Sequence, residues 1–399
     1  MKILYVYQGD WPRNATRVLK QTRALAEAKH SILLLSGNPR GEPRFGAEPW
    51  MEIERVPHIG PSRLNRYLTF PIFTNPFWLL WIFRSARRFH ADAIVVRDLP
   101  LAPAALAIGK VLHVPVHYEM ADVYPVAMRA NRSDHPGVVS HFTRNAQAAE
   151  WIDRWVIRRA ASIFVVSEES RARCIALGAA SQNVVLVGNT PAHLPSVPRG
   201  VPLPADLADW AGRPLVLFVG NLLADRGLVE AIDAIDRVRR VIPDAALVVI
   251  GDGREEPRLA AHIRNAGLGE FVRLLGWKPL SEHADYYEHA SIGLLPFLPT
   301  EHIRITLANK LFDYMGAGLP IIATDVPPMR RVLDETGAGV LVKDAEADAI
   351  AAAIVELLAD PARRKALGDR GRAAVAGPYS WSRDRDRFLQ AIARGREHS

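Results

Sequence analysis

The sequence predicts an α/β protein with two doubly wound domains, each built on a mostly parallel sheet. Short apolar runs alternate with helical patterns from one end to the other, which is typical of parallel strands buried on both faces and joined by crossover helices. A proline-dense stretch at 189–204 interrupts the alternation, and the same alternation then begins again. The 399 residues suffice for two or three domains of ordinary size.

The first domain is predicted to span 1–190. A helical pattern at 17–27 follows the first strand. Asn75 and Pro76 mark the start of another helix, because asparagine caps helices and proline suits their first turn. Strands are expected where apolar runs lie between turn-forming residues, at 3–7, 31–35, 94–96, 114–118, 163–166 and 184–187.

The proline-rich segment 191–212 is interpreted as a linker, since proline fits neither a sheet ladder nor a helix interior. A second α/β domain is predicted at 213–378, and 379–399 is expected to form a closing helix that returns to the first domain. Strands of the second domain are expected at 215–219, 246–250, 272–275, 292–296 and 320–324.

Composition and charge limit the class of protein and its partners. The chain is 49% hydrophobic and 23% charged, which excludes a disordered, collagen-like or coiled-coil protein. The net charge of +7 favours anionic partners such as nucleotide phosphates. The single cysteine, Cys174, fits a reducing cytosol. Apolar runs are far shorter than the about 20 residues that span a bilayer, so a cytoplasmic protein is expected.

Two domains joined by one linker predict a ligand cleft between the carboxyl ends of their strands. Thr306 is expected to cap a helix there that ends near Gly316. Lys310 and Asp313 share one face near its start, where free N–H groups and the helix dipole favour a diphosphate. Lys310 is then a phosphate ligand and Asp313 a ribose ligand. The alternative is an ordinary exposed ion pair.

Two turns after strands of the second domain are further candidates for a phosphate site. Gly220 ends the strand at 215–219, and Arg226 in the next loop presents a guanidinium that suits phosphate. The alternative is a surface arginine that holds the loop. Gly251 lies in a second strand-to-helix turn, where a single Gly-x-Gly is weak evidence for phosphate binding.

In the first domain, Glu119 and Asp122 follow a strand, and either carboxylate is a candidate to orient or deprotonate an acceptor hydroxyl. The alternative for Asp122 is loop capping. Gly9 lies at the first strand-to-helix junction, followed by Asn14 and Arg17. Gly9 allows a ligand to approach the backbone and Arg17 is a candidate anion ligand, unless they are a turn glycine and a solvated helix cation.

Missing motifs argue against several kinds of site. No Gly-x4-Gly-Lys-Ser/Thr loop and no Gly-x-Gly-x-x-Gly after the first strand are present, which disfavours P-loop hydrolysis and dinucleotide oxidoreduction. Paired cysteines for zinc are absent. His113 and His117 fall on a predicted strand, roughly 13 Å apart and too distant to share a metal. No metal and no resident cofactor are expected.

The segment 75–89 combines aromatic side chains with Arg84, Arg87 and Arg88. A helix of this composition suits a membrane interface, so a peripheral contact with an anionic membrane through 70–90 is one hypothesis. The alternative is a helix packed on the first sheet with its arginines in solvent. No segment resembles a nucleic-acid-binding motif, and no nucleic-acid partner is expected.

In combination these segments resemble the retaining glycosyltransferases of family 4 (glycosyl transferases group 1), which have the GT-B fold of two facing Rossmann-like domains. The resemblance extends over nearly the whole chain and includes a polysaccharide-biosynthesis subgroup. It is carried by Phe218–Leu222 with Asp225–Gly227, Val248–Gly253, Arg273–Trp277 and Asn309–Pro320 in the second domain, and by Arg97–Leu101, Tyr118–Pro125 and Gly188–Pro191 in the first.

The resemblance implies that the second domain binds a nucleotide-diphospho-sugar, the donor substrate, without a metal. Three positions depart from the family pattern: Ile305 replaces the first of two spaced acids, Asn221 a loop arginine, and Ala121 a histidine of the first domain. Asp313 keeps the second acid. The donor-binding residues implied are Gly220, Asn221, Arg226, Gly251, Trp277, Thr306, Leu307, Asn309, Lys310 and Asp313.

The reaction implied is retaining transfer of a sugar to an acceptor hydroxyl, with Lys310 compensating for the missing donor contacts and Asp122 or Glu119 at the acceptor. The acceptor is expected to be lipid-linked, or a glycan in exopolysaccharide or cell-surface synthesis, at the inner face of the cytoplasmic membrane. The alternatives are a GT-B enzyme with a soluble acceptor, a nucleotide-sugar epimerase, and a non-catalytic subunit that binds a nucleotide-sugar.

Overall fold

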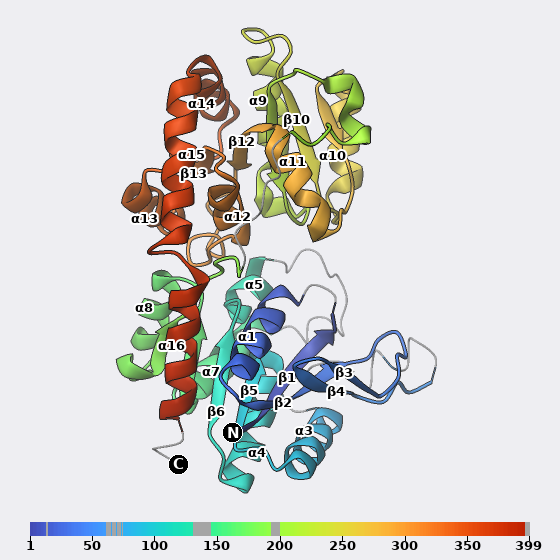
Figure 1. The fold of residues 1–399 in the computed structure, drawn as a ribbon, viewed down its shortest axis with the longest axis vertical. Helices are drawn as coiled ribbons and strands as arrows, with labels where there is room; N and C mark the ends of the chain where they lie inside the picture. Colours follow the sequence, from blue (N-terminus) through green and yellow to red (C-terminus); the bar gives the residue numbers. More distant parts are fainter. Residues whose placement is uncertain are drawn as a thin grey trace. The chain divides into compact units, whose positions relative to one another are not determined.

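The structure is a computed structural model that describes residues 1–12, 15–60, 65, 69, 73, 75–130, 145–192 and 200–395. The chain divides into two compact units (Figure 1). Unit 1 combines Met1–Gly188 with Ser382–Ser399, and unit 2 is Asn189–Trp381. Both units are α/β with largely parallel sheets, which confirms the predicted fold class.

The described strands of unit 1 form one eight-stranded sheet in the order β3-β4-β2-β1-β5-β6-β7-β8. Neighbouring strands pair in parallel except β3 with β4, an antiparallel hairpin at the sheet edge. This hairpin is not predicted from the sequence, because β3 is largely exposed and has no apolar run. The strands are β1 (Lys2–Asp10), β2 (Ser31–Gly37), β3 (Phe45–Glu48), β4 (Met51–Arg55), β5 (Ala93–Arg97), β6 (Val116–Met120), β7 (Ser162–Val165) and β8 (Val184–Leu186).

Side-chain caps set the starts of several helices in unit 1. The Asn75 side chain accepts a hydrogen bond from Phe77 N, which confirms the predicted start of α3.

The C-terminal helix α16 packs on this unit, where the rings of Phe388 and Phe164 meet edge to face with centroids 4.8 Å apart. The helices are α1 (Thr16–Glu27), α3 (Pro76–Phe89), α4 (Ala102–Leu112), α5 (Tyr124–Ala130), α7 (Ala146–Ile157), α8 (Glu168–Ala176), α16 (Trp381–Arg394) and the 3-10 turns η1 (Leu99–Leu101) and η2 (Ser181–Asn183).

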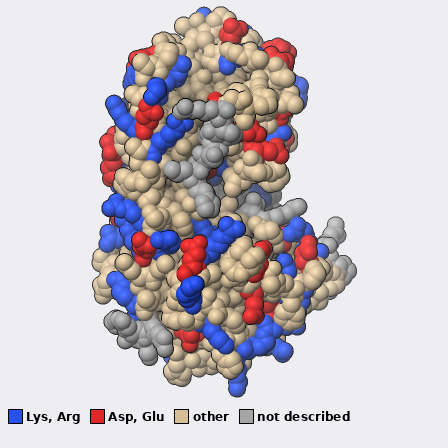
Figure 2. Space-filling view, in the orientation of Figure 1, with Lys and Arg blue, Asp and Glu red and all other residues tan. Residues whose placement is uncertain are grey.

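Helix α3 packs its tryptophans into unit 1, since Trp78 is 1% exposed and Trp81 is 9% exposed. Arg88 reaches the buried carboxylate of Glu54 at 2.7 Å. The helix therefore matches the packed alternative, although Leu80 on its outer face is 51% exposed. Basic side chains gather over the end of unit 1 where α3 lies (Figure 2). Within the described residues, no helix has the length and apolar character to cross a membrane.

The described strands of unit 2 form a six-stranded parallel sheet in the order β11-β10-β9-β12-β13-β14. The strands are β9 (Leu215–Val219), β10 (Ala246–Ile250), β11 (Val272–Leu274), β12 (Ala290–Leu295), β13 (Ile321–Thr324) and β14 (Gly339–Val342). The helices are α9 (Leu228–Val238), α10 (Glu256–Asn265), α11 (His283–His289), α12 (Asn309–Ala317), α13 (Pro327–Thr336), α14 (Ala347–Ala359), α15 (Pro361–Ala376) and the 3-10 turns η3 (Ala205–Trp210), η4 (Ala224–Arg226) and η5 (Leu280–Glu282).

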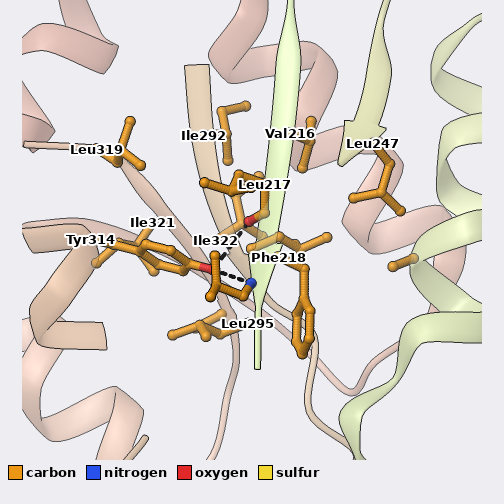
Figure 3. Packing of buried hydrophobic residues seen from close by; sticks show 14 of the residues in the cluster. Val216, Leu217, Phe218, Leu247, Ile292, Leu295, Tyr314, Leu319, Ile321 and Ile322 are labelled. Atoms are coloured by element: carbon orange, nitrogen blue, oxygen red, sulfur yellow. Dashed lines mark hydrogen bonds between the residues drawn. The ribbon is translucent and has the colours of Figure 1, made fainter. Parts of the chain in front are cut away.

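The core of unit 2 contains one tyrosine whose hydroxyl is hydrogen-bonded to the central strand (Figure 3). Tyr314 Oη accepts a hydrogen bond from Val219 N at 2.9 Å and lies 3.3 Å from Leu217 O, to which it donates. Its ring covers Gly293 of β12, where a Cβ atom would lie 2.5 Å from the ring. These contacts fix α12, which carries Lys310 and Asp313, against β9 and β12.

The second half of the predicted linker 191–212 belongs to the packed part of unit 2. Leu207 and Trp210, on η3, are buried in its core. Arg273 of β11 lies over the Trp210 ring at 4.2 Å and pairs with Asp209 at 2.8 Å. The linker prediction is therefore wrong for this half, because two apolar side chains among the prolines anchor the segment. Residues 193–199 lie outside the described chain.

Candidate active site

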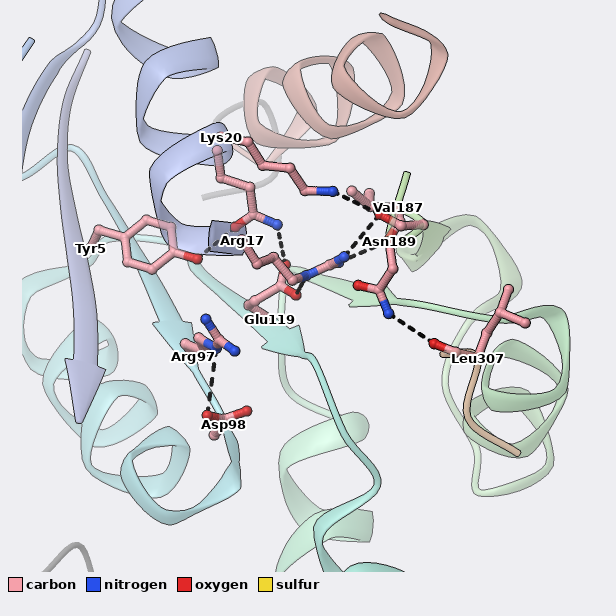
Figure 4. Close-up of polar contacts among 11 residues, drawn as sticks. Tyr5, Arg17, Lys20, Arg97, Asp98, Glu119, Val187, Asn189 and Leu307 are labelled. Carbon is pink, nitrogen blue, oxygen red and sulfur yellow. Dashed lines mark hydrogen bonds and ion pairs between the residues drawn. The ribbon is translucent and has the colours of Figure 1, made fainter. Parts of the chain in front are cut away.

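In unit 1 the predicted site residues lie at or near the carboxyl ends of parallel strands. Parallel strands end at one edge of a sheet, and ligands of open α/β sheets bind there. Gly9 lies near the end of β1, Glu119 is the last residue but one of β6, and Asp122 follows β6. Arg17, in the first turn of α1, contacts the same edge (Figure 4). Asn14 lies outside the described residues.

The Glu119 carboxylate is completely buried and both of its oxygens are engaged. Oε1 pairs with Arg17 Nε, and Oε2 accepts a hydrogen bond from Gln21 Nε2 at 2.6 Å (Figure 4). Gln21 Oε1 in turn accepts a hydrogen bond from Tyr5 at 2.5 Å. Glu119 thus ties α1 to the sheet interior. This role differs from the predicted one at an acceptor hydroxyl, since its carboxylate has no surface to offer.

Arg17 is buried as well, and its guanidinium connects α1 to the chain after β8. Nη2 donates to Val187 O at 2.7 Å and Nη1 to Gly188 O at 3.0 Å. Lys20 Nζ donates to the same Gly188 carbonyl at 3.2 Å. The structure therefore does not place Arg17 as a solvated cation, and its donors hold the backbone at the end of unit 1.

Gly9 lies against a side chain of unit 1. A Cβ atom on Gly9 would lie 2.2 Å from the hydroxyl oxygen of Tyr7, whose ring covers it. The place beside the Gly9 backbone that was predicted for a ligand is thus taken by the Tyr7 side chain of the same strand. Asp122 is partly exposed, and its Oδ1 accepts a hydrogen bond from Val123 N at 2.8 Å, as in the loop-capping alternative.

The sequence analysis missed Arg97 and Asp98, which follow β5 at the same edge (Figure 4). Arg97 Nε lies 3.6 Å from Asp98 Oδ2, and the Arg97 guanidinium lies over the Tyr7 ring at 5.3 Å. Burial raises the pKa of Asp98 to about 6; Arg97 opposes this shift and Asp122 adds to it. Their place directly after a buried strand is the sequence signal that marks these two residues.

In unit 2 the loops after β9, β10 and β11 are joined by their backbones. Gly251 N donates to Gly276 O at 2.8 Å, and Leu222 N donates to Asp252 O at 2.8 Å. A Cβ atom on Gly251 would lie 1.9 Å from Gly220 O, so only glycine fits there. Gly220 and Gly251 thus lie together at the carboxyl edge. Trp277, after β11, is 62% exposed, and Asn221 is exposed.

Arg226 lies on η4 and is held by two contacts. Its guanidinium lies 4.8 Å from the Phe297 ring centroid, and Nη1 lies 3.2 Å from Asp225 Oδ1. Asp225 also faces His302 Nδ1 at 3.4 Å. Burial alone would raise the pKa of Asp225, but the hydrogen bond from His302 and the charge of Arg226 outweigh it and lower that pKa. Arg226 is thus a fixed, largely buried cation.

Helix α12 begins later than predicted. It starts at Asn309 after Ala308, with no side-chain cap, whereas Thr306 Oγ1 donates to His302 O at 2.9 Å. The predicted cap at Thr306 is therefore wrong, because a preceding turn of the chain takes its hydroxyl. Leu307 is buried and its carbonyl accepts a hydrogen bond from Asn189 Nδ2 at 3.1 Å. The backbone N–H groups at the start of α12 have no side-chain cap within the described residues.

Lys310 and Asp313 lie beside this helix start and pair at 2.9 Å, each with one fifth of its side chain exposed. Burial together with the Lys310 charge lowers the pKa of His283 to about 4. Burial and the charge of Asp313 raise the pKa of Tyr287. The ion pair predicted as the alternative is therefore present, at an uncapped helix start that suits an anion.

The two histidines considered for a metal do not share a strand. His113 ends α4 with φ 56°, and His117 is buried in β6 against the Phe164 ring. Burial lowers the pKa of His117 to about 4. Within the described residues, no three His, Cys, Asp or Glu side chains form a group able to hold a metal ion.

Comparison with known proteins identifies both halves of the chain. Residues 15–190 match the family "Glycosyl transferase 4-like domain", and residues 213–360 match "Glycosyl transferases group 1". The chain is 25% identical over 384 residues to the 2-deoxystreptamine glucosyltransferase of Streptomyces kanamyceticus, covering 91% of this chain and 94% of that protein. It is 32% identical over 168 residues to the phosphatidyl-myo-inositol mannosyltransferase of Mycobacterium leprae, covering 42% and 43%.

Solved structures share the fold over the whole chain. Sucrose-phosphate synthase from Thermosynechococcus elongatus superposes with a TM-score of 0.78 at 18% identity, covering 100% of both chains. HepE from Anabaena in complex with UDP-glucose superposes with a TM-score of 0.72 at 14% identity, covering 98% of this chain and 99% of that one. With both halves matched in sequence and the fold shared throughout, the chain belongs to the group 1 glycosyltransferases of the GT-B fold.

Proposed function

We propose that this glycosyltransferase moves a sugar from a nucleotide-diphospho-sugar to an acceptor hydroxyl with retention of anomeric configuration. The observation that carries the proposal is the uncapped start of α12 with Lys310 and Asp313 beside it. Free N–H groups and an ammonium suit a diphosphate, and a carboxylate one helical turn on suits ribose hydroxyls. HepE, which shares the fold, has been solved with UDP-glucose, and this supports a donor of the same class.

In this mechanism the residues of unit 2 position the donor and stabilise charge. Lys310 and the α12 N–H groups bind the diphosphate, whose charge increases as the anomeric bond breaks. Arg226 is rigid because Phe297 and Asp225 hold it, and preorganised cations stabilise a leaving group without reorganisation. The electron pair of the broken bond leaves with the nucleoside diphosphate, whose phosphate takes the acceptor proton. No metal is needed in this scheme.

The test replaces the two donor residues in the full chain. Lys310→Ala and Asp313→Ala are each expected to abolish sugar transfer and to weaken the thermal shift given by a nucleotide-sugar. Lys365→Ala is the matched control, since Lys365 pairs with Asp369 on the exposed surface of α15. Undiminished transfer by both variants would overturn the proposal. A screen of UDP-, GDP-, ADP- and dTDP-sugars by thermal shift names the donor class.

A lipid-linked acceptor at the inner face of the cytoplasmic membrane, in surface-glycan synthesis, is a second proposal. It is favoured by the outer face of α3, where Leu80 is 51% exposed beside the exposed Arg84 and Arg87. An apolar side chain among arginines suits an anionic membrane interface. The burial of Trp78 and Trp81 makes this surface smaller than the sequence indicates.

Flotation with vesicles that contain an anionic phospholipid tests the membrane contact. We expect the wild type to float with the vesicles and the double variant Leu80→Glu/Arg84→Glu to stay in the bottom fraction. Val241→Glu is the control, since Val241 is an apolar residue of unit 2 that is 66% exposed. Absence of wild-type binding would favour a soluble acceptor, of the kind named for the 2-deoxystreptamine glucosyltransferase. Transfer by the isolated protein excludes an epimerase and a non-catalytic subunit.

A further inference from the structure

Asp98 has an unusual backbone conformation for a residue with a side chain. It follows β5 with φ 68° and ψ 152°, a region that only glycine enters at low cost. Its N–H donates to Glu119 O at 3.1 Å, so the end of β6 holds this conformation. Backbone strain of this kind persists where the surroundings enforce it, and it concentrates at functional sites.

Arg97 beside it has donors that no described group satisfies. Nε and Nη1 are buried and have no hydrogen-bond partner among the described residues, although Nε lies 3.6 Å from Asp98 Oδ2. Tyr7 supplies only its ring face, at 5.3 Å. A buried guanidinium without hydrogen bonds is costly, so Arg97 has donor capacity for a polar ligand at this edge.

The other carboxylates of the edge are less suited to a ligand. Glu119 is fully buried and engaged by Arg17 and Gln21. Asp122 already accepts a hydrogen bond from Val123 N. Asp98 keeps 18% of its side chain exposed, and its one described side-chain partner is Arg97. A carboxylate acceptor and a guanidinium donor therefore lie side by side at the rim of the sheet.

We propose that Asp98 and Arg97 bind the acceptor of sugar transfer, a polyhydroxylated ring such as a sugar or a cyclitol. The Asp98 carboxylate accepts a hydrogen bond from a hydroxyl next to the reacting one, and the Arg97 guanidinium, whose side chain is 16% exposed, donates to an oxygen of the same ring. This inference rests on the proposed function and names the acceptor residues for it. The oxygen of the reacting hydroxyl attacks the anomeric carbon as the bond to the diphosphate breaks, and the proton of that hydroxyl passes to the leaving phosphate.

The experiment uses the full chain with the nucleotide-sugar that gives the wild type the largest thermal shift in the donor screen, and with the best acceptor found for the wild type among sugars and cyclitols. Asp98→Asn keeps the size of the side chain and removes its charge. Asp98→Gly removes the side chain and relieves the backbone, since glycine enters this region freely. His113→Gly is the matched control: His113 also has positive φ, 56°, but is exposed at the C-terminus of α4, before β6 begins.

We expect both Asp98 variants to lose about 100-fold in transfer, because a misplaced acceptor costs about that much, while the donor gives the wild-type thermal shift. Asp98→Gly is expected to melt no lower than the wild type, and His113→Gly to transfer normally. Transfer by Asp98→Gly within a few-fold of wild type would overturn the assignment. A wild type that shows neither a donor shift nor transfer would overturn the proposed function, and this inference with it.

Discussion

Arg17 and Glu119 form an ion pair buried inside unit 1, which ties the first turn of α1 to the end of β6. The same guanidinium donates to the carbonyls of Val187 and Gly188, so one side chain joins three segments far apart in the sequence. The sequence predicts Arg17 and Glu119 as two separate site residues, but in the structure they pair with each other and hold segments of unit 1 together.

Glu119→Ala should destabilise unit 1 by about 3–5 kcal/mol, because it leaves the buried Arg17 guanidinium without its counter-charge. Urea unfolding of the full chain measures this. Glu150→Ala is the control: Glu150 pairs with Arg129 at 3.2 Å on the surface, and its loss should cost less than about 1 kcal/mol. A stable Glu119→Ala protein with no transfer activity would instead support the acceptor role predicted from sequence.

Most of the fold could be predicted from the sequence, because a parallel strand that is buried on both faces consists of consecutive apolar residues. β9 and β10 are uninterrupted apolar segments and appear where expected. β14, which begins with glycine and is only partly buried, gave no comparable signal.

The site is harder to predict from the sequence, because contacts from distant segments determine whether a carboxylate is buried or exposed. Glu119 and Asp98 both lie at strand ends, but Arg17 and Gln21, which are distant in sequence, engage the carboxylate oxygens of Glu119.

The strand-end glycines of unit 2 provide a prediction about packing. Gly251→Ala should destabilise unit 2 by several kcal/mol and disorder the predicted donor loop, because its Cβ would lie 1.9 Å from Gly220 O. Gly267→Ala isolates the backbone contribution: Gly267 has φ 66°, but no described atom lies within 4 Å of the place its Cβ would take, so about 1 kcal/mol is expected. Equal losses in thermal unfolding for the two variants would contradict the steric explanation.

Tyr314→Phe should destabilise unit 2 by about 1–3 kcal/mol, because Val219 N loses its acceptor inside the core. The effect should reach the donor site, since Tyr314 belongs to the helix that begins at Asn309. Tyr379→Phe is the comparison, because the Tyr379 hydroxyl pairs with Glu335 in an exposed contact. Urea midpoints of the two variants measure the loss of stability. A loss for Tyr379→Phe as large as that for Tyr314→Phe would contradict a stabilising role for the buried hydrogen bond to Val219 N.

The raised pKa of Asp98 predicts a pH dependence of stability. Its folded value of about 6 exceeds the unfolded value of about 3.9, so between these values the folded state holds a proton that the unfolded state releases. The stabilising contribution is therefore complete below about pH 4 and is lost as the pH rises through about 6. Arg97 and Arg17 oppose this shift, whereas Asp122 and Glu119 add to it.

Asp98→Asn cannot titrate, so it should remove this dependence. The free energy of unfolding of the wild type relative to Asp98→Asn should fall by up to about 3 kcal/mol between pH 4 and pH 7 and then stay constant. Thermal unfolding of both proteins across that range measures the difference. A difference that is flat from pH 4 to pH 7 would show that Asp98 is solvated in the folded chain. The carboxylate would then lack the buried setting beside Arg97 on which its role at the acceptor depends.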